Sequence, residues 1–157
     1  MGNFKTNVMR ILETNKIEYT LYTYESNGDF DGCSVAGKIG KNPEQVFKTL
    51  VTVAPSKKYY VFVVPVVREL DLKACAAAVG EKSIEMIPVK DINKITGYIR
   101  GGCSPIGMKK QYVTVIDRSC KDFEKIVFSA GKIGYQVEIP VDALIELIGA
   151  EIGEIAR

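Results

Sequence analysis

The sequence contains no histidine, and this absence excludes several kinds of catalytic site. A Ser-His-Asp triad, a Cys-His dyad and the common histidine-based zinc sites all require an imidazole. Histidine is also the one side chain whose unperturbed pKa lies close to neutrality. Any catalysis must therefore use lysine, carboxylate, hydroxyl or thiol side chains, backbone amides, or groups of the substrate itself.

Cysteines are few, and none stands in a C-x-x-C pair; they are Cys33, Cys75, Cys103 and Cys120. A zinc ribbon or a thioredoxin-like motif is therefore disfavoured. Residues 1–15 contain no apolar segment of the signal-peptide type, and reduced thiols are typical of the cytosol. We therefore expect a cytoplasmic protein that uses no metal and no cofactor.

Long apolar runs are also lacking. The longest, residues 59–67, is interrupted by Pro65 and is far shorter than the roughly 20 residues of a membrane span. The 157 residues, of which 46% are hydrophobic, suffice for one domain with a core of its own. We expect a single domain over residues 1–157 and no membrane partner.

Charge of one sign is not in large excess, because 21 basic residues oppose 19 acidic ones. The distribution is uneven, with basic residues dominating residues 90–132 and acidic residues dominating residues 138–157. A chain polarised in this way could present a basic face to phosphate groups. Ordinary variation of surface charge explains the pattern equally well, so both interpretations stay open.

Apolar periodicity and turn residues predict alternating groups of helices and strands. Helices are expected over residues 6–15, 34–40, 71–79, 89–95 and 140–149, with Ser34 as the N-cap of the second. Strands are expected over residues 18–24, 46–54, 59–65, 83–87, 112–117, 124–129 and 135–139. Several strands follow one another without an intervening helix, which favours an α+β fold. We predict a mixed, mostly antiparallel, curled or barrel-like sheet flanked by helices.

Lys48 is the first candidate for chemistry, because it interrupts the apolar strand expected over residues 46–54. Strand alternation places Lys48 on one face with Val46 and Leu50. A lysine in this position is either a gatekeeper on an exposed sheet edge or a charge held over a pocket. In a pocket its amine could hold an anion or donate a hydrogen bond to a carbonyl.

The second candidate is the segment over residues 97–107, which contains four glycines and one proline. Backbone amides of such a loop can approach a ligand closely and form an oxyanion site, although a plain surface loop is the alternative. Neither a Walker loop nor a Rossmann fingerprint is present. Cys103 is a possible nucleophile in this loop, but no histidine could activate it. Residues 129–134 are typical of a hairpin turn.

Together these features resemble the YbaK/EbsC family of free-standing Cys-tRNA(Pro) deacylases, which are related to the editing domain of bacterial prolyl-tRNA synthetases. The matching stretches occur in family order and span nearly the whole chain. They are residues 23–25 (TYE), 42–50 (NPEQVFKTL), 70–73 (LDLK), 96–98 (TGY), 101–110 (GGCSPIGMKK) and 129–132 (SAGK).

The resemblance implies a single editing domain with a barrel-like mixed sheet and a pocket for the aminoacylated 3′ end of tRNA. The catalytic residues that it implies are Lys48, Gly101 and Gly102. The substrate-binding residues that it implies are Tyr24, Phe30, Thr49, Ser104, Pro105 and Ser129. The sequence departs from the family at Gln136, where some members carry an acidic residue.

The implied activity is hydrolysis of mischarged Cys-tRNA(Pro), in which the thiol of the bound cysteine attacks its own ester carbonyl. This scheme agrees with the lack of histidine, because the enzyme then supplies mainly positioning and oxyanion stabilisation. The implied partners are the aminoacyl-tRNA 3′ end and prolyl-tRNA synthetase. Two alternatives remain: a deacylase for Ala-tRNA(Pro) or another aminoacyl-tRNA, and a non-catalytic module that binds the tRNA end or a synthetase.

Overall fold

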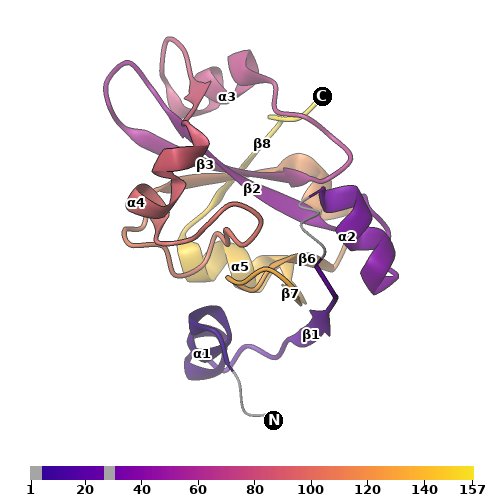
Figure 1. The fold of residues 1–157 in the computed structure, drawn as a ribbon. Helices are drawn as coiled ribbons and strands as arrows, with labels where there is room; N and C mark the ends of the chain where they lie inside the picture. The colour runs from indigo at the N-terminus through magenta and orange to yellow at the C-terminus, as the bar shows by residue number, and fades with distance from the viewer. Residues whose placement is uncertain (1–4, 27–30) are drawn as a thin grey trace.

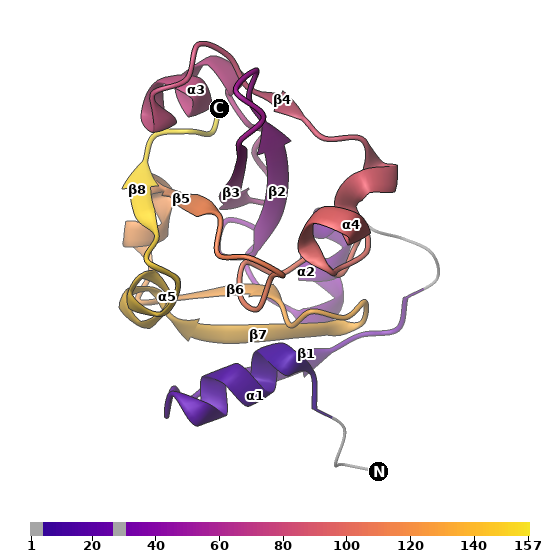
Figure 2. The ribbon, with the colours of Figure 1, turned by 90° about the vertical axis from the view of Figure 1, so that its left-hand side faces the viewer.

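The computed structural model describes residues 5–26 and 31–157, whose arrangement is shown in Figures 1 and 2. The helices are α1 (Asn7–Thr14), α2 (Gly32–Ile39), α3 (Leu72–Val79), α4 (Ile92–Thr96) and α5 (Val141–Ile148). The strands are β1 (Thr20–Thr23), β2 (Phe47–Val53), β3 (Tyr59–Pro65), β4 (Glu85–Met86), β5 (Val113–Asp117), β6 (Lys125–Ser129), β7 (Tyr135–Pro140) and β8 (Glu151–Gly153). Two 3-10 helices are η1 (Val89–Asp91) and η2 (Arg118–Asp122). None of the described helices is long and apolar enough to cross a membrane.

The strands form two sheets. The larger has the order β4-β2-β3-β5-β8, with antiparallel pairing among β4, β2 and β3 and parallel pairing among β3, β5 and β8. The smaller has the order β1-β7-β6 and is antiparallel throughout. In Figure 2 the strands of the smaller sheet run across the direction of β2 and β3. The predicted α+β class with a mixed, mostly antiparallel sheet is confirmed.

The two sheets meet just before β2 begins. Val46 forms a parallel bridge to Val127 of β6, whose N–H donates to the Gln45 carbonyl at 3.0 Å. On its other side, the Val46 carbonyl accepts from the Val66 N–H at 2.8 Å. Val46 therefore connects the sheets, which curl around a shared core without closing into a complete barrel over the described residues.

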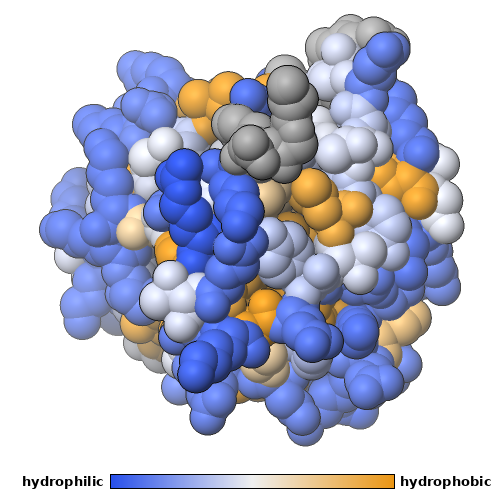
Figure 3. Space-filling view, turned by 90° about the horizontal axis from the view of Figure 1, so that it is seen from below, coloured by the Kyte–Doolittle hydropathy of each residue, from blue (hydrophilic) through white to orange (hydrophobic). Residues whose placement is uncertain are grey.

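The main core lies between the sheets and is covered by α1 and α5. Alternation along the strands directs one set of side chains into this core, and Phe47 of β2 and Phe128 of β6 are both buried there. Val8 and Leu12, four residues apart on α1, pack against the same cluster. The surface on the α1 side is mainly hydrophilic, with small and separate apolar areas (Figure 3). The helix therefore shields the core from one side.

The start of α2 differs from its prediction. The helix begins at Gly32, and its N-cap is Asp31 rather than Ser34. The Asp31 carboxylate accepts a hydrogen bond from the Cys33 N–H at 3.3 Å, which satisfies one of the free amide groups of the first turn. Within α2, Ala36 belongs to the small cluster that covers the second face of β6.

Neither η2 nor β8 is predicted from the sequence, because both are too short to show a periodicity. β8 forms because its backbone pairs in parallel with β5. The chain beyond β8 is held by Asp117, whose buried carboxylate accepts hydrogen bonds from the N–H groups of Ile155 and Ala156 at 3.2 and 3.1 Å. These contacts join residues that are far apart in the sequence.

Candidate functional site

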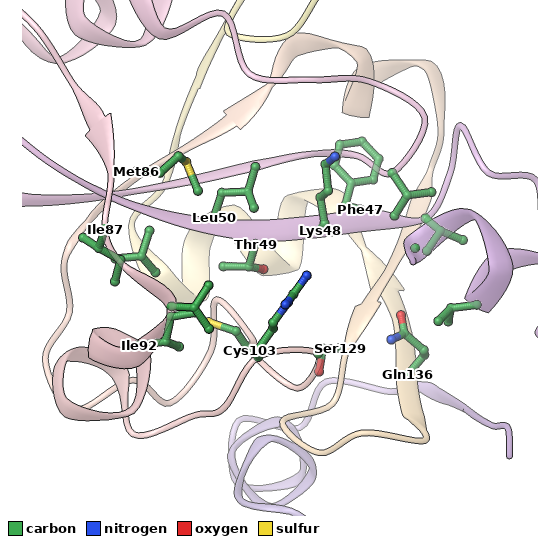
Figure 4. Close-up of a pocket in the computed structure, with 18 of the residues that line it drawn as sticks. Phe47, Lys48, Thr49, Leu50, Met86, Ile87, Ile92, Cys103, Ser129 and Gln136 are labelled. Atoms are coloured by element: carbon green, nitrogen blue, oxygen red, sulfur yellow. The ribbon is translucent and has the colours of Figure 1, made fainter. Parts of the chain in front are cut away.

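A cavity of about 370 Å³ lies beside an open edge of β2 (Figure 4). Here β4 pairs with only Thr52 and Val53, and the bridge to β6 involves only Val46. Between these contacts, the edge of β2 has no strand beside it in the described part of the chain. The cavity occupies this gap, and its walls come from β2, the smaller sheet, the η1–α4 segment and the glycine-rich loop.

Backbone pairing determines which groups of β2 face the gap. In an antiparallel pair, successive residues direct their N–H and C=O groups toward opposite edges. The carbonyl of Val46 accepts from Val66 on the β3 side, whereas the carbonyl of Val51 accepts from the Ile87 N–H at 3.3 Å on the opposite edge. Thr49 lies two residues before Val51, so its backbone groups point to the same edge as those of Val51. Its N–H and C=O therefore face the gap, where a ligand could bind them.

The side chains of Lys48 and Thr49 leave β2 on opposite sides, so both faces of the strand border the cavity (Figure 4). Lys48 is half-buried, and its ammonium makes no ion pair or hydrogen bond with the described residues. The hydroxyl of Thr49 is buried and also has no hydrogen-bond partner among them. This placement favours the pocket interpretation of Lys48 over the gatekeeper interpretation.

The smaller sheet contributes a polar wall. Ser129 of β6 and Gln136 of β7 are register partners, and both line the cavity. Gln136 is only 6% exposed, and its Oε1 has no hydrogen-bond partner in the described residues. The hydroxyl of Ser129 accepts from the Gly131 N–H at 3.1 Å. A buried polar atom without a partner costs about 1–3 kcal/mol, so Gln136 and Thr49 are acceptors suited to donors of a ligand.

The glycine-rich loop forms the wall opposite β2. Gly101 adopts a φ of 86°, which a residue with a side chain rarely adopts, and it lines the cavity. Gly102 does not line the cavity but packs against the 129–134 hairpin, where an added Cβ would lie 3.1 Å from the Ile133 backbone nitrogen. Tyr98 fixes the loop from within, because its hydroxyl donates to the Ile106 carbonyl.

The residues implied by the resemblance are thus partly brought together. Those that line the cavity are Lys48, Thr49, Tyr24, Gly101 and Ser129. Those that are buried beside it and shape the loop are Gly102, Ser104 and Pro105. Within this loop, the Ser104 hydroxyl accepts from the Ile106 N–H at 3.3 Å. Phe30 lies outside the described residues.

Part of the lining is not predicted from the sequence. Arg100 borders the cavity beside Gly101, and an apolar wall comes from Met86, Ile87, Val89 and Ile92. The apolar wall has no signal in the sequence, since single apolar residues around a short strand are common. The sequence marks Gln136 only as a departure from the family pattern. Gln136 precedes the apolar Val137 in a strand, so the two side chains point to opposite faces of the sheet. Both are buried, so the face that carries Gln136 is covered as well.

A model of the family described as "Aminoacyl-tRNA editing domain" matches residues 34–147. The chain belongs to the aminoacyl-tRNA editing domain family. It is also 43% identical over 152 residues to EbsC of Enterococcus faecalis, a proposed Cys-tRNA(Pro)/Cys-tRNA(Cys) deacylase. That match covers 96% of this chain and 93% of EbsC. The resemblance found in the sequence is therefore confirmed.

Solved structures share the fold of this editing domain. The crystal structure of a hypothetical protein superimposes with a TM-score of 0.88 at 19% identity, over 97% of this chain and 100% of that chain. The crystal structure of a proposed trans-editing enzyme for prolyl-tRNA synthetase gives a TM-score of 0.82 at 19% identity, over 98% of this chain and 99% of that chain. At such identities the likeness concerns the fold alone.

Among the described residues, the charges that line the editing-domain cavity are of one sign. Lys48 and Arg100 line it, and no carboxylate of the described residues does. Cys103 lines it too, but burial raises the pKa of its thiol to about 11. The thiol is therefore neutral near pH 7, and the described part of the site contains no nucleophile paired with a base. Nor do the described residues contain a cluster of three or more groups that could hold a metal.

We predict that iodoacetamide at neutral pH labels Cys33 in the native protein and leaves the other three cysteines largely unmodified. Cys33 is exposed, whereas burial raises the pKa of Cys75 to about 12 and that of Cys103 and Cys120 to about 11. Peptide mapping by mass spectrometry measures the labelling, with the urea-unfolded protein as the control in which all four react. Rapid native labelling of Cys103 would show an activated thiol and contradict this prediction.

Proposed function

We propose that this protein is a trans-editing deacylase that hydrolyses the ester bond of mischarged Cys-tRNA(Pro). The observation that carries the proposal is the 43% identity to EbsC over 96% of the chain. The cavity supports it, because cations, backbone groups and hydrogen-bond acceptors meet there, and its described residues include no nucleophile–base pair. Such a site suits a reaction in which the enzyme positions a substrate that brings its own nucleophile.

In the proposed reaction, the sulfur of the esterified cysteine attacks its own carbonyl carbon. A C–S bond forms and the ester C–O bond breaks, so the ribose hydroxyl leaves with the proton lost by the thiol. The product is a four-membered thiolactone, which water then opens to free cysteine. Negative charge develops on the carbonyl oxygen during the attack, and positioned donors stabilise it. The protein contributes orientation and electrostatics rather than a covalent intermediate.

The residues around the cavity take separate roles in this proposal. The ammonium of Lys48 and the backbone amide of Gly101 face the carbonyl or the terminal phosphate. Tyr24, Thr49 and Ser129 contact the aminoacyl and ribose groups. The buried loop residues Gly102, Ser104 and Pro105 act by holding the loop in place rather than by touching the substrate. Prolyl-tRNA synthetase is the proposed partner, because it generates mischarged tRNA(Pro).

We predict that purified protein deacylates Cys-tRNA(Pro) at least about 100-fold faster than Ser-tRNA(Pro), which differs only in oxygen for sulfur. A thiol ionises near pH 8.5 in model compounds, whereas a serine hydroxyl needs a base that the described cavity lacks. Single-turnover hydrolysis across neutral and mildly alkaline pH measures this difference. The Cys-tRNA rate should rise with the thiolate fraction of the substrate.

The same assay includes Ala-tRNA(Pro) and Cys-tRNA(Cys). Equal cleavage of the cysteinyl, seryl and alanyl esters would replace the thiol mechanism by one that uses water or a ribose hydroxyl. Cleavage of none of them, with tRNA still bound, would favour a non-catalytic binding module. Cleavage of both cysteinyl-tRNAs would show that the protein recognises the cysteine thiol and does not distinguish the two tRNAs.

We predict that Lys48→Met lowers the deacylation rate by about 100–1,000-fold, the usual effect of losing one positioned electrostatic contact. Methionine keeps the length and apolar stem of lysine, so the strand should remain folded. Lys58→Met is the matched control, because Lys58 is exposed at the turn between β2 and β3 and does not border the cavity. A Lys48→Met protein that folds normally and retains full activity would exclude Lys48 from the site.

We predict that Gln136→Met weakens substrate binding while leaving the free protein at least as stable. The lost Oε1 has no partner among the described residues, so its removal should be neutral or stabilising for the free energy of unfolding. The Michaelis constant for Cys-tRNA(Pro) should rise by about 10-fold, since one hydrogen bond is worth roughly 1.5 kcal/mol. Thermal melting and steady-state kinetics measure the two effects. A lower melting temperature with unchanged kinetics would show that Gln136 is only structural.

A further inference from the structure

Of the nine basic residues from position 90 to position 132, eight separate into two groups in the structure, and the ninth, Lys132, lies over the ring of Tyr135. One group belongs to η1, α4 and the glycine-rich loop: Lys90, Lys94, Arg100, Lys109 and Lys110. The second belongs to η2 and β6: Arg118, Lys121 and Lys125. Figure 2 shows α4 on one side of β2 and α5 with β8 on the other, and η2 directly follows β5 of the latter side. Basic residues that are continuous in the sequence therefore face different surroundings.

The second group lies among acidic residues. Arg118 forms an ion pair with Glu154 at 3.2 Å. Lys121 borders a second hollow together with Glu124 and Asp142. Arg118 and Lys121 of the second group therefore have carboxylates near them.

The first group forms what we call the basic rim, defined as Lys90, Lys94, Arg100, Lys109 and Lys110. All five side chains are exposed. Between positions 87 and 116 the sequence contains only one acidic residue, Asp91, which pairs with Lys94 at 3.6 Å. The Nζ of Lys109 donates to the Lys94 carbonyl at 3.2 Å, so the two separate segments of the rim are in contact.

The basic rim adjoins the cavity. Arg100 is itself a lining residue, and Val89 and Ile92, on either side of Lys90 and Asp91 in the chain, line the same cavity. A cavity of about 370 Å³ can enclose little more than the aminoacyl group and its terminal nucleoside. The rest of a tRNA must therefore leave the cavity across its rim, where its phosphates would meet exposed cations.

We infer that the basic rim binds the backbone phosphates of the tRNA acceptor end next to the aminoacylated nucleotide. This inference rests on the proposed function, because it takes aminoacyl-tRNA as the substrate. Lysine contacts to phosphates fix the position of a nucleic acid without reading its sequence, and they release counterions. The rim thus supplies affinity and orientation, whereas the cavity carries the chemistry.

The test uses a triple variant of the rim, Lys90→Gln, Lys94→Gln and Lys109→Gln. Arg100 is left intact because it borders the cavity. The matched control is Arg118→Gln, Lys121→Gln and Lys125→Gln, which removes the same charge from the opposite side. Thermal melting establishes that both triple variants are folded.

The rim variant should raise the Michaelis constant for Cys-tRNA(Pro) by about 10-fold or more, with turnover at saturation unchanged. The slope of log affinity against log salt should fall by roughly 2–3, close to one for each lost phosphate contact. Hydrolysis of the cysteinyl ester of adenosine, which has no acceptor stem, should not change. The control variant should resemble the unmodified protein in all three measurements.

Equal salt slopes and Michaelis constants for the rim and control variants would overturn the inference. So would an equal loss on the adenosine ester, because the rim would then act on the cavity itself. If the unmodified protein cleaves no aminoacyl-tRNA, the proposed function fails, and filter binding of uncharged tRNA(Pro) to the same variants still tests the rim. Weaker tRNA binding by the rim variant alone would support phosphate binding at the basic rim. Equal tRNA binding by both variants would exclude it.

Discussion

The open edge of β2 is the constraint on which the site depends. In the register of β4 and β2, Val89 would be the residue to pair with Thr49. The chain turns at Pro88 instead, whose φ of −62° suits the start of a helical turn, and Val89 becomes the first residue of η1. Thr49 consequently keeps its edge free, and η1 and α4 form a wall at a distance rather than a neighbouring strand. A longer β4 would fill the space that the cavity occupies.

This gap leaves polar groups that folding alone does not satisfy. The hydroxyl of Thr49 and the Oε1 of Gln136 are both buried without a hydrogen-bond partner among the described residues. Such groups destabilise the free protein by about 1–3 kcal/mol each, and proteins tolerate them mainly at functional sites. The extensive core between the two sheets offsets this cost. Both unpartnered side chains and the unpaired edge of β2 therefore border the same cavity.

The electrostatics of the cavity follow from where the carboxylates are held. Glu138 lies two residues after Gln136 on the same face of β7. Its carboxylate accepts from the Tyr22 hydroxyl at 2.8 Å and from Gln45 at 3.1 Å, and it pairs with Lys41 at 3.2 Å. The hydrogen bond to Glu138 raises the pKa of Tyr22. The charge of Glu138 is thus balanced within its own network, and the charged side chains that line the cavity among the described residues are Lys48 and Arg100.

The sequence by itself determined the local elements and the family. The strands over residues 59–65 and 135–139 and the helix over residues 71–79 follow from contacts between near neighbours in the chain, which periodicity and turn rules describe. Only the tertiary structure decided that Lys48 borders a cavity, that Gly102 packs on a hairpin and that the basic stretch divides into two groups. Each of these depends on segments far apart in the sequence. A gap beside a strand exists only where a neighbouring strand ends. The residue pattern of a single strand does not indicate where its neighbour ends.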